Sequence, residues 1–389
     1  MTPPSFLAEP GLSAVMAALP NARVVGGAVR DTLAGMAVAD IDLATPDLPE
    51  RVVASLGRAG LRTIPTGLGH GTVTALANGR GYEVTTLRRD VATDGRHAVV
   101  AFTADWREDA ARRDFTLNAL SMTRAGTVFD YFGGAEDLRA GRVRFVGDPA
   151  QRIAEDYLRI LRFFRFNARY GRPPPDPAAL AAIRTGVSGL ARLSPERVWS
   201  ELRRILGGPD PGETVALMAS LGVLAAVLPE GADSARLARA MPDDPVLRLA
   251  ALSTGPAEAV ADRLRLSNAE RARLAALRAG PTPRPEDDDA SLRRLLADTP
   301  ADTLIDRVWL AGGGLPEWAA LRARLAGMER PVFPLAGRDV LALGVAPGPR
   351  VGALLDAVRE WWLEAGCGAD ADACAERLRA LIALDGGGK

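Results

Sequence analysis

The chain has 389 residues, which is enough for two or three domains. Hydrophobic residues make up 48% and charged residues 25%, a composition that excludes a disordered or fibrous chain. The formal net charge is +0, so any surface that binds a polyanion must be local.

Cysteine and histidine are scarce. Cys367 and Cys374 alone exclude a disulfide scaffold and a four-cysteine zinc site, and His70 with His97 cannot form a histidine-rich one. The N-terminus MTPPSFLAEP lacks a basic start followed by an apolar stretch, and no apolar run approaches the roughly 18 residues that span a bilayer. We therefore expect a cytoplasmic protein without a membrane partner, and nothing indicates an obligate protein partner.

Residues 1–146 show a mixed pattern of helices and strands. Apolar alternation, helical spacing and glycine breaks predict these elements in chain order: helix 11–19, strand 22–25, helix 28–33, strand 41–44, helix 50–59, paired strands 70–76 and 82–87, a polar loop between Arg88 and Trp106, a core segment 115–122 and an edge strand 128–131.

The character of the chain changes after residue 147. Alanine, leucine and arginine dominate, and helical periodicity replaces the β-branched runs. Helices are predicted over 150–169, 177–184, 195–205 and 212–219. The sequence therefore predicts an α+β protein with a mixed N-terminal domain, 1–146, that carries a long all-helical arm.

The first set of residues that could carry chemistry is GGAVRD, residues 26–31, followed by Asp40-Ile41-Asp42. Side chains alternate along a strand, so Asp40 and Asp42 should project to one side. Two such carboxylates can share Mg²⁺ ions, which activate an attacking hydroxyl and stabilise departing pyrophosphate. Gly27 lets backbone N–H groups approach a triphosphate, and Arg30 can pair with its oxygens.

Each of these signals is weak alone, because a Gly-Gly pair is usually a turn and an Asp-x-Asp usually a solvated edge. Their order, strand, Gly-Gly, helix and then Asp-x-Asp, is more specific. Glu83 on the strand 82–87 is the candidate for a third carboxylate. The competing interpretation of Glu83 is an outward-facing strand residue.

The second set is Arg112-Arg113-Asp114, directly before an apolar segment. Paired arginines beside an aspartate suit a phosphate clamp whose orientation the carboxylate fixes. A tripeptide of this kind in isolation is more often a surface salt-bridge cluster.

The third set lies in EDYLRILRFFR, residues 155–165. On a continuous helix Asp156, Arg159 and Arg162 span one flank, whereas Arg165 falls on the side opposite Asp156. Between residues 142 and 172 eight arginines accompany three acids, so positive charge is concentrated here. The simpler interpretation is an amphipathic helix with ordinary intrahelical ion pairs.

Asp156 and Arg159 suit a sharper use. Cytosine and adenine both present an exocyclic amine beside an unprotonated ring nitrogen, so an aspartate can accept from the first and an arginine donate to the second. Uracil and guanine reverse this pattern and would leave buried polar groups unpaired. Each unpaired group costs about 1–3 kcal/mol of binding free energy. This pair could accept CTP and ATP and refuse UTP and GTP.

Four segments resemble the class II tRNA nucleotidyltransferase family, in the order that this family shows. They are GGAVRDTLAGMAVADIDLAT, EVTTLRRDVATDGRHAVVAFTADWREDAARRDFTLNAL, FDYFGGAEDLRAGRVRFVGDP and EDYLRILRFFRF. The resemblance runs through residues 22–170, and SPERVWSEL, 194–202, is similar to the next helix of the family. Beyond about residue 210 no resemblance is apparent.

The resemblance implies a polymerase-β-like nucleotidyltransferase head (1–146), a helical neck with the nucleotide-selecting helix (147–210), and a helical body and tail that bind tRNA (211–389). It implies metal ligands at Asp40 and Asp42. It implies nucleotide contacts at Gly27, Arg30, Arg113, Asp156, Arg159, Arg162 and Arg165. The stretch 90–97 resembles the flexible loop associated with the switch from CTP to ATP, in which Asp94 and Arg96 are expected to matter.

The same head serves full CCA-adding enzymes, partial enzymes that add CC or A, and bacterial poly(A) polymerases. Poly(A) polymerases usually carry a Gly-Arg/Lys-Arg-Phe-type signature where this chain has GLGHGTVTAL, and the intact-looking loop argues against a CC-only enzyme. We therefore expect addition of C, C and A to the tRNA 3′ end from CTP and ATP with Mg²⁺, with poly(A) or partial addition as the alternatives.

Two further classes are less consistent with the motifs. A small-molecule nucleotidyltransferase would share Gly-Gly and Asp-x-Asp but would not need the base reader formed by Asp156 and Arg159. A non-catalytic RNA-binding module would be expected to have replaced Asp40 or Asp42, and both are present.

Overall fold

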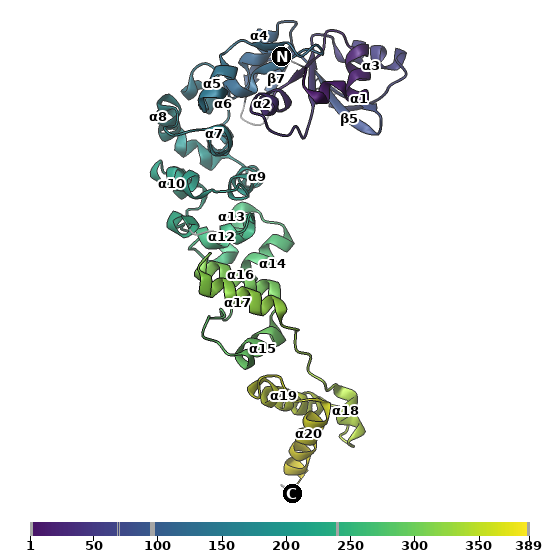
Figure 1. The fold of residues 1–389 in the computed structure, drawn as a ribbon, viewed down its shortest axis with the longest axis vertical. Coiled ribbons are helices and arrows are strands. Elements are labelled where there is room, and N and C mark those ends of the chain that lie inside the picture. The colour runs from purple at the N-terminus through teal and green to yellow at the C-terminus, as the bar shows by residue number, and fades with distance from the viewer. Residues whose placement is uncertain (1–2, 68, 70, 94–97, 239–240, 387–389) are drawn as a thin grey trace. The chain divides into compact units, whose positions relative to one another are not determined.

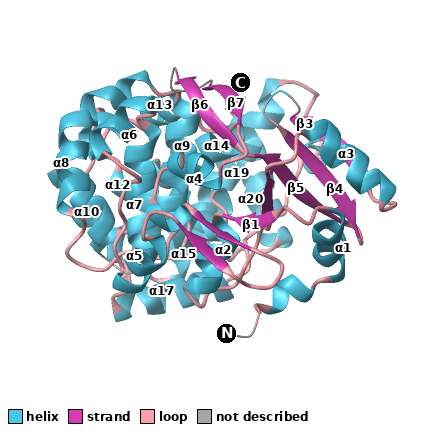
Figure 2. Cartoon of the chain, turned by 90° about the horizontal axis from the view of Figure 1, so that it is seen from above, coloured by secondary structure: helices cyan, strands magenta, loops and turns pink. Residues whose placement is uncertain are grey.

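The computed structural model describes residues 3–67, 69, 71–93, 98–238 and 241–386 (Figure 1). The chain forms two compact units, Met1–Pro229 and Glu230–Lys389. The strands of the described chain lie in the first unit, where they appear magenta in Figure 2. This arrangement confirms the predicted α+β class, in which a small mixed sheet precedes helices.

The head contains a seven-stranded sheet in the order β3-β4-β5-β2-β1-β8-β9. The β2–β5 pair is parallel, and each other neighbouring pair is antiparallel. The strands that form it are β1 (Arg23–Val25), β2 (Asp42–Thr45), β3 (Arg62–Gly67), β4 (Thr72–Ala77), β5 (Arg80–Thr86), β8 (Leu120–Met122) and β9 (Val128–Asp130).

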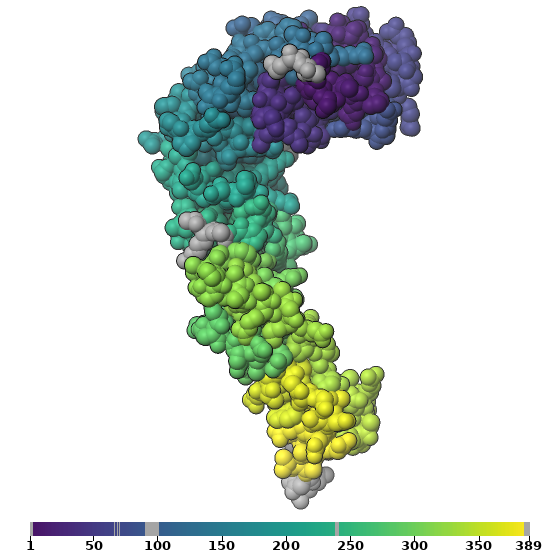
Figure 3. Space-filling view, in the orientation of Figure 1, coloured from purple at the N-terminus to yellow at the C-terminus, as the bar shows by residue number. Residues whose placement is uncertain are grey.

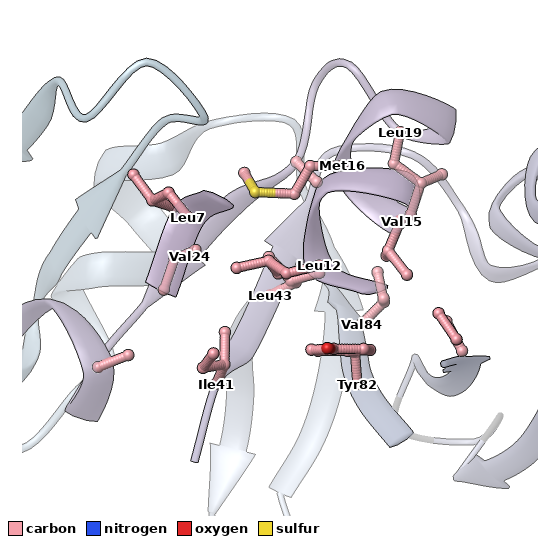
Figure 4. Packing of buried hydrophobic residues seen from close by; sticks show 14 of the residues in the cluster. Leu7, Leu12, Val15, Met16, Leu19, Val24, Ile41, Leu43, Tyr82 and Val84 are labelled. Atoms are coloured by element: carbon pink, nitrogen blue, oxygen red, sulfur yellow. The ribbon is translucent and has the colours of Figure 1, made fainter. Parts of the chain in front are cut away.

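The core of the head lies between this sheet and α1 (Pro10–Ala18) and α3 (Pro49–Arg58). Figure 4 shows Leu12 and Val15 of α1 near Leu43, Val84 and Tyr82 of the sheet, and all five are at most 1% exposed. In the space-filling view the side chains of the head, purple to blue, close the gaps that the ribbon leaves (Figure 3). Burial of these alternating strand residues stabilises the sheet and so fixes the positions of the polar motifs at the ends of its strands.

A separate hairpin occupies most of the segment predicted as a loop between Arg88 and Trp106. Strands β6 (Arg88–Thr93) and β7 (Ala98–Phe102) pair antiparallel. The prediction of a loop was therefore wrong over these two strands. The Asp-Gly pair between two runs containing valine and alanine is a hairpin signal that outweighs the polar composition of the segment.

The remaining helices of the first unit lie before the strands, between them or after them in the chain. They are η1 (Ser5–Ala8), α2 (Gly27–Leu33), α4 (Trp106–Ala111), η3 (Thr116–Asn118), α5 (Gly134–Ala140), α6 (Pro149–Glu155), α7 (Leu158–Tyr170), α8 (Pro177–Gly186), η4 (Val187–Arg192), α9 (Pro195–Leu206), α10 (Gly212–Ser220) and α11 (Val223–Val227).

The helix predicted over 150–169 is interrupted at Asp156. This residue is extended, with φ −155° and ψ 106°, and α7 begins after it. One Asp156 oxygen accepts a hydrogen bond from the Leu158 N–H at 3.1 Å. An aspartate that satisfies an N–H of the first turn favours a helix start over a helix interior. The assumption of a continuous helix through Asp156 was therefore wrong.

Aromatic side chains join α7 to the segment after the Arg-Arg-Asp motif. The ring of Phe115 lies 4.8 Å from that of Phe145 and 5.3 Å from that of Phe166, and the Phe145 and Phe163 rings stack at 6.1 Å. These rings are buried, so α7 is fixed against the head by apolar packing.

The second unit is helical throughout its described part. Its elements are η5 (Ser234–Ala238), α12 (Pro245–Leu252), α13 (Ala257–Leu264), α14 (Asn268–Arg278), α15 (Asp289–Asp298), α16 (Ala301–Gly312), α17 (Pro316–Gly327), α18 (Gly337–Ala342), α19 (Pro349–Glu364) and α20 (Ala371–Gly386). Separate apolar clusters stabilise α15–α17 and α18–α20. Over the described residues no helix combines the length and apolarity needed to cross a membrane. The finer boundaries at 146 and 210 stay predictions.

Gly134 gives a test of the packing between α5 and η3. A Cβ on Gly134 would lie 2.1 Å from the Thr116 carbonyl oxygen, a backbone atom that cannot rotate away. We expect Gly134→Ala to lower the free energy of unfolding in urea by about 1–3 kcal/mol. Gly57→Ala is the matched control, because a Cβ there meets no atom within 4 Å in helix α3. It should raise stability by roughly 0.5–1 kcal/mol, and equal stability of the two variants would contradict the packing.

Candidate active site

Strand register places the candidate catalytic carboxylates. Asp42 is the first residue of β2, opposite Glu83 of the parallel strand β5 and opposite Val25 of the antiparallel strand β1. Asp40 precedes the strand, in contrast to the prediction that it belongs to a regular alternation. Because Gly26 directly follows Val25, one end of the sheet brings together the Gly-Gly turn and the carboxylates.

The electrostatic state of Asp42 shows that these carboxylates are close. Burial raises its pKa above the ordinary value, and Glu83 and then Asp40 add to the rise, while Arg113 opposes it. In the described part of the chain none of the three carboxylates forms a hydrogen bond or ion pair with a side chain. A cation would relieve this repulsion between like charges.

The donor set fits Mg²⁺ better than a fully protein-enclosed metal. Among the described residues no group of three or more His, Cys, Asp or Glu side chains could together hold a metal ion. Mg²⁺ is usually bound by one or two carboxylates together with water and substrate phosphate oxygens. Asp40 and Asp42 are residues that could supply such ligands, and Glu83 is the strand neighbour of Asp42.

The Gly26–Gly27 turn lies against the guanidinium of Arg113. Gly26 has φ 62°, and a Cβ on it would lie 3.1 Å from Nη1 of Arg113. A side chain at this position would therefore strain the backbone and displace the arginine. The same nitrogen donates to the Asn118 carbonyl oxygen at 3.3 Å, which fixes the guanidinium beside the turn.

Arg30 is buried and oriented by three neighbours. Its Nη1 donates to Oδ1 of Asn118 at 2.6 Å, and its Nε donates to Oδ1 of Asp31 at 2.9 Å. The Tyr170 hydroxyl also donates to this oxygen at 2.5 Å, and the Tyr170 ring lies 4.6 Å from the guanidinium carbon of Arg30. A cation held this rigidly is preorganised to contact an anion.

Asp114 joins the Arg-Arg-Asp motif to α7. Its Oδ2 accepts from Nε of Arg162 at 2.6 Å, and its Oδ1 accepts from Asn118 Nδ2 at 3.0 Å and from the Phe115 N–H at 2.9 Å. Burial would raise the pKa of Asp114, but the Arg162 charge and these hydrogen bonds hold it below the ordinary value. Asp114 therefore remains ionised and positions Arg162.

These groups surround a cavity of about 410 Å³. Five arginines and three aspartates line it, so it is polar and carries excess positive charge. The residues that line it are Gly26, Gly27, Arg30, Asp42, Arg113, Asp114, Asn118, Asp156, Leu158, Arg159, Arg162, Phe166 and Arg197. Tertiary structure thus brings all three sequence motifs to one space.

Asp156 and Arg159 reach this cavity although they do not share a continuous helix. Oδ2 of Asp156 accepts from Nη2 of Arg197 at 2.7 Å. Nη1 of Arg159 contacts Oε2 of Glu155 at 2.7 Å and donates to the Arg152 carbonyl oxygen at 2.9 Å. Each half of the predicted base reader is therefore held by a neighbouring side chain.

Arg165 lies outside the lining of this cavity. Its Nε is 2.9 Å from Oε2 of Glu201, an ion-pair contact whose angle does not satisfy a hydrogen bond. Burial lowers the pKa of Arg165 to about 10 despite the attraction of Glu201. The position agrees with the expectation that Arg165 faces away from Asp156, and its proposed contact with the nucleotide stays a prediction.

The structure adds residues to which the sequence assigned no role. Asn118 binds both Arg30 and Asp114, and Arg197 binds Asp156. Both lie inside the quoted segments RRDFTLNAL and SPERVWSEL, so the resemblance was the available signal for them. The predicted loop residues Asp94 and Arg96 lie outside the described residues.

A paired set of carboxylates beside a Gly-Gly turn, facing a cavity lined by arginines, is the site expected of a nucleotidyltransferase. Comparison with known families agrees with this class. Residues 22–144 match the Poly A polymerase head domain, and residues 175–234 match a probable RNA and SrmB-binding site of polymerase A.

Curated relatives define the family more closely. The mitochondrial CCA tRNA nucleotidyltransferase 1 of Homo sapiens is 38% identical over 364 residues, which cover 88% of this chain and 83% of the relative. The CCA-adding enzyme of Lacticaseibacillus paracasei is 41% identical over 213 residues, 54% of this chain and 52% of the relative. The chain therefore belongs to the CCA tRNA nucleotidyltransferase family, which confirms the resemblance seen in its motifs.

Solved structures show the same fold. The crystal structure of the Bacillus stearothermophilus CCA-adding enzyme in complex with CTP has a TM-score of 0.80 and 29% identity, covering 96% of this chain and 97% of that one. The Thermotoga maritima CCA-adding enzyme complexed with tRNA has a TM-score of 0.67 at 20% identity, covering 95% and 93%. The second likeness concerns the fold alone.

The Tyr170–Asp31 bond predicts a measurable dependence of stability on pH. Burial and then this bond raise the pKa of Tyr170 to about 12, above the ordinary value of 10. The stabilisation is fully present below pH 10 and is lost as pH rises toward 12. Tyr170→Phe should lower the free energy of unfolding by about 1.5–3 kcal/mol at pH 8. Above pH 10 the difference in this free energy between the variant and wild type should become smaller. Urea unfolding from pH 8 to 11 tests this, and a constant difference would contradict it.

Proposed function

We propose that this protein adds C, C and A to the 3′ end of tRNA, using CTP and ATP and releasing pyrophosphate. The observation that carries the proposal is that Asp156 and Arg159 line the same cavity as Asp42 and the Gly26–Gly27 turn. A triphosphate beside the turn and a base beside the pair fit one nucleotide. The names of the relatives support the choice of reaction.

The protein side chains take the part of a template. Oδ1 or Oδ2 of Asp156 accepts from the exocyclic amine of cytosine or adenine, and Arg159 donates to the neighbouring ring nitrogen. UTP and GTP would set a carbonyl against the carboxylate and an N–H against the guanidinium. Glu155 and Arg197 limit the rotation of the two readers before a base arrives.

Arg30 and Arg113 bind and orient the triphosphate. Both guanidiniums line the cavity and both are hydrogen-bonded to Asn118, so their direction is fixed before substrate binds. Arg162 adds positive charge from α7, held in place by Asp114. Orientation before binding lowers the entropy cost of placing the α-phosphate for attack by the tRNA hydroxyl.

Asp40 and Asp42 would hold Mg²⁺, with Glu83 as the third carboxylate. When bound, the metal supplies charge that activates the attacking hydroxyl and stabilises the leaving pyrophosphate. Among the described residues these carboxylates have no side-chain hydrogen bond or ion pair, so their oxygens are available to a cation. We assign tRNA binding to the helical residues beyond the head, in accordance with the RNA-binding match over 175–234. The cytoplasmic location and the loop over 90–97 stay predictions.

The experiment that tests the reaction is nucleotide incorporation into a tRNA transcript that lacks its last three residues. With Mg²⁺, we expect two C residues from CTP alone and a terminal A when ATP is added. A long A tail made without CTP would instead identify a poly(A) polymerase. Transfer that stops after CC, or that needs a preformed CC end, would identify a partial enzyme.

Asp42→Ala tests the assignment of the carboxylates. We expect loss of nucleotide transfer of about 10³-fold or more with tRNA binding retained, because the ligand is removed and the arginines remain. Incorporation and tRNA gel-shift measurements give the two readouts. Asp47→Asn, just beyond the other end of β2, is the control and should keep activity. Retained turnover in Asp42→Ala would refute the assignment.

Arg159→Ala tests the base reader. Loss of the guanidinium donor should slow the incorporation of CTP and ATP, and it should remove the cost of placing the N–H of UTP or GTP against that guanidinium. The preference for CTP over UTP should therefore fall by about 10- to 100-fold. Competition between CTP and UTP on the same transcript measures this ratio. Arg169→Ala, exposed on the same helix, should leave the ratio unchanged. An unchanged ratio in Arg159→Ala would show that another group reads the base.

A further inference from the structure

A buried carboxylate lies behind the Arg-Arg pair and outside the lining of the nucleotide cavity. Asp109 is in α4 and is 3% exposed. It bonds both arginines but is absent from the residues that line the cavity, and the proposed reaction gives it no chemical role. A fully ionised group at such a position costs desolvation energy, so its contacts are informative.

Asp109 accepts hydrogen bonds from three residues. Its Oδ1 accepts from Nε and Nη2 of Arg112 at 2.9 and 2.8 Å and from the Arg88 backbone N–H at 3.2 Å. Its Oδ2 accepts from Nη2 of Arg113 at 3.2 Å. One carboxylate therefore connects both arginines to the first residue of strand β6.

The ionised state of Asp109 is strongly favoured. Burial would raise its pKa, but the charges of Arg112 and Arg113 and the hydrogen bonds from Arg112 and the Arg88 N–H hold it below the ordinary value. Asp109 therefore keeps its negative charge throughout the neutral range. Arg113 is held on two sides, by Asp109 and by the Asn118 carbonyl oxygen.

Arg113 has a competing direction in which it could turn. It lies close enough to Asp42 to lower the pKa of that carboxyl, and Glu83 and Asp40 lie beside Asp42. Without Asp109, the attraction of Arg113 to Asp42 would no longer be opposed by a carboxylate bonded to its Nη2 atom. The guanidinium of Arg113 would then move away from Gly26 and Gly27, where the triphosphate is proposed to bind.

We propose that Asp109 is a positioning residue that holds Arg113 toward the triphosphate and away from the catalytic carboxylates. The inference rests on the proposed function, because it assumes that Arg113 binds the triphosphate. The proposal predicts a specific pattern in the KM values for CTP and ATP. The triphosphate is common to CTP and ATP, so both nucleotides must be affected by the same factor and base selectivity must not change.

Asp109→Asn is the primary variant, because the amide oxygen can still accept from the Arg88 N–H while the charge is removed. We expect the KM for CTP and for ATP to rise together by about tenfold, with kcat changed less than threefold. The preference for CTP over UTP should equal that of wild type. Asp109→Glu, which restores the charge, should recover at least part of the loss in KM.

A double-mutant cycle with Arg113→Ala gives the sharpest test. If Asp109 acts through Arg113, Asp109→Asn should raise KM little further once Arg113 is alanine. Equal and independent effects of the two substitutions would overturn the proposal. So would an unchanged or lower KM in Asp109→Asn.

Asp105→Ala separates positioning from simple destabilisation. Asp105 caps the same helix by accepting from the Arg107 N–H at 2.8 Å, and it has no bond to Arg113. This variant should lower the unfolding midpoint with KM unchanged. A matching KM change in Asp105→Ala would overturn the positioning role of Asp109. These measurements require that the wild-type protein adds C, C and A to the tRNA transcript. A wild-type protein that lacks this activity would refute the proposed function itself, independently of the role of Asp109.

Discussion

The strand register at one end of the head sheet is the constraint on which the rest of the site depends. Because β1 runs antiparallel and β5 runs parallel to β2, Asp42 lies between Val25, which precedes the Gly-Gly turn, and Glu83. A shift by one residue would turn Asp42 toward the apolar core and Leu43 toward solvent. The buried face that contains Leu43, Val84 and Tyr82 opposes this shift. Apolar packing on one side of the sheet therefore fixes the carboxylates on the other.

Each arginine that is proposed to bind the triphosphate has a carboxylate as a bonded neighbour. Asp31 orients Arg30, Asp109 orients Arg113, and Asp114 orients Arg162. This pairing reconciles a formal net charge of +0 with a cavity in which arginines predominate. Guanidiniums held in this way can present fixed donors to phosphate.

Much of the candidate site was visible in the sequence because its motifs, each weak alone, occur together in a specific order. Asp40, Asp42, Asp156 and Arg159 were selected from residue type and spacing, and the resemblance singled out Arg113. The helical-wheel argument for Asp156 failed on a local detail, since a backbone N–H bond to its carboxylate starts α7 there. The hairpin at β6–β7 was missed because composition was weighed above its turn signal. Asp156 lines the cavity in spite of the first error.

The sequence alone determined the α+β class, the order of the motifs and the chemistry that each could supply, because these follow from local periodicity and from side-chain functional groups. Only the tertiary structure decided which motifs share one cavity, that Glu83 is the strand neighbour of Asp42, and that Arg165 turns to Glu201. It also decided the partners Asn118 and Arg197. These contacts join residues up to 88 positions apart. They depend on strand pairing and aromatic packing, which no local pattern specifies.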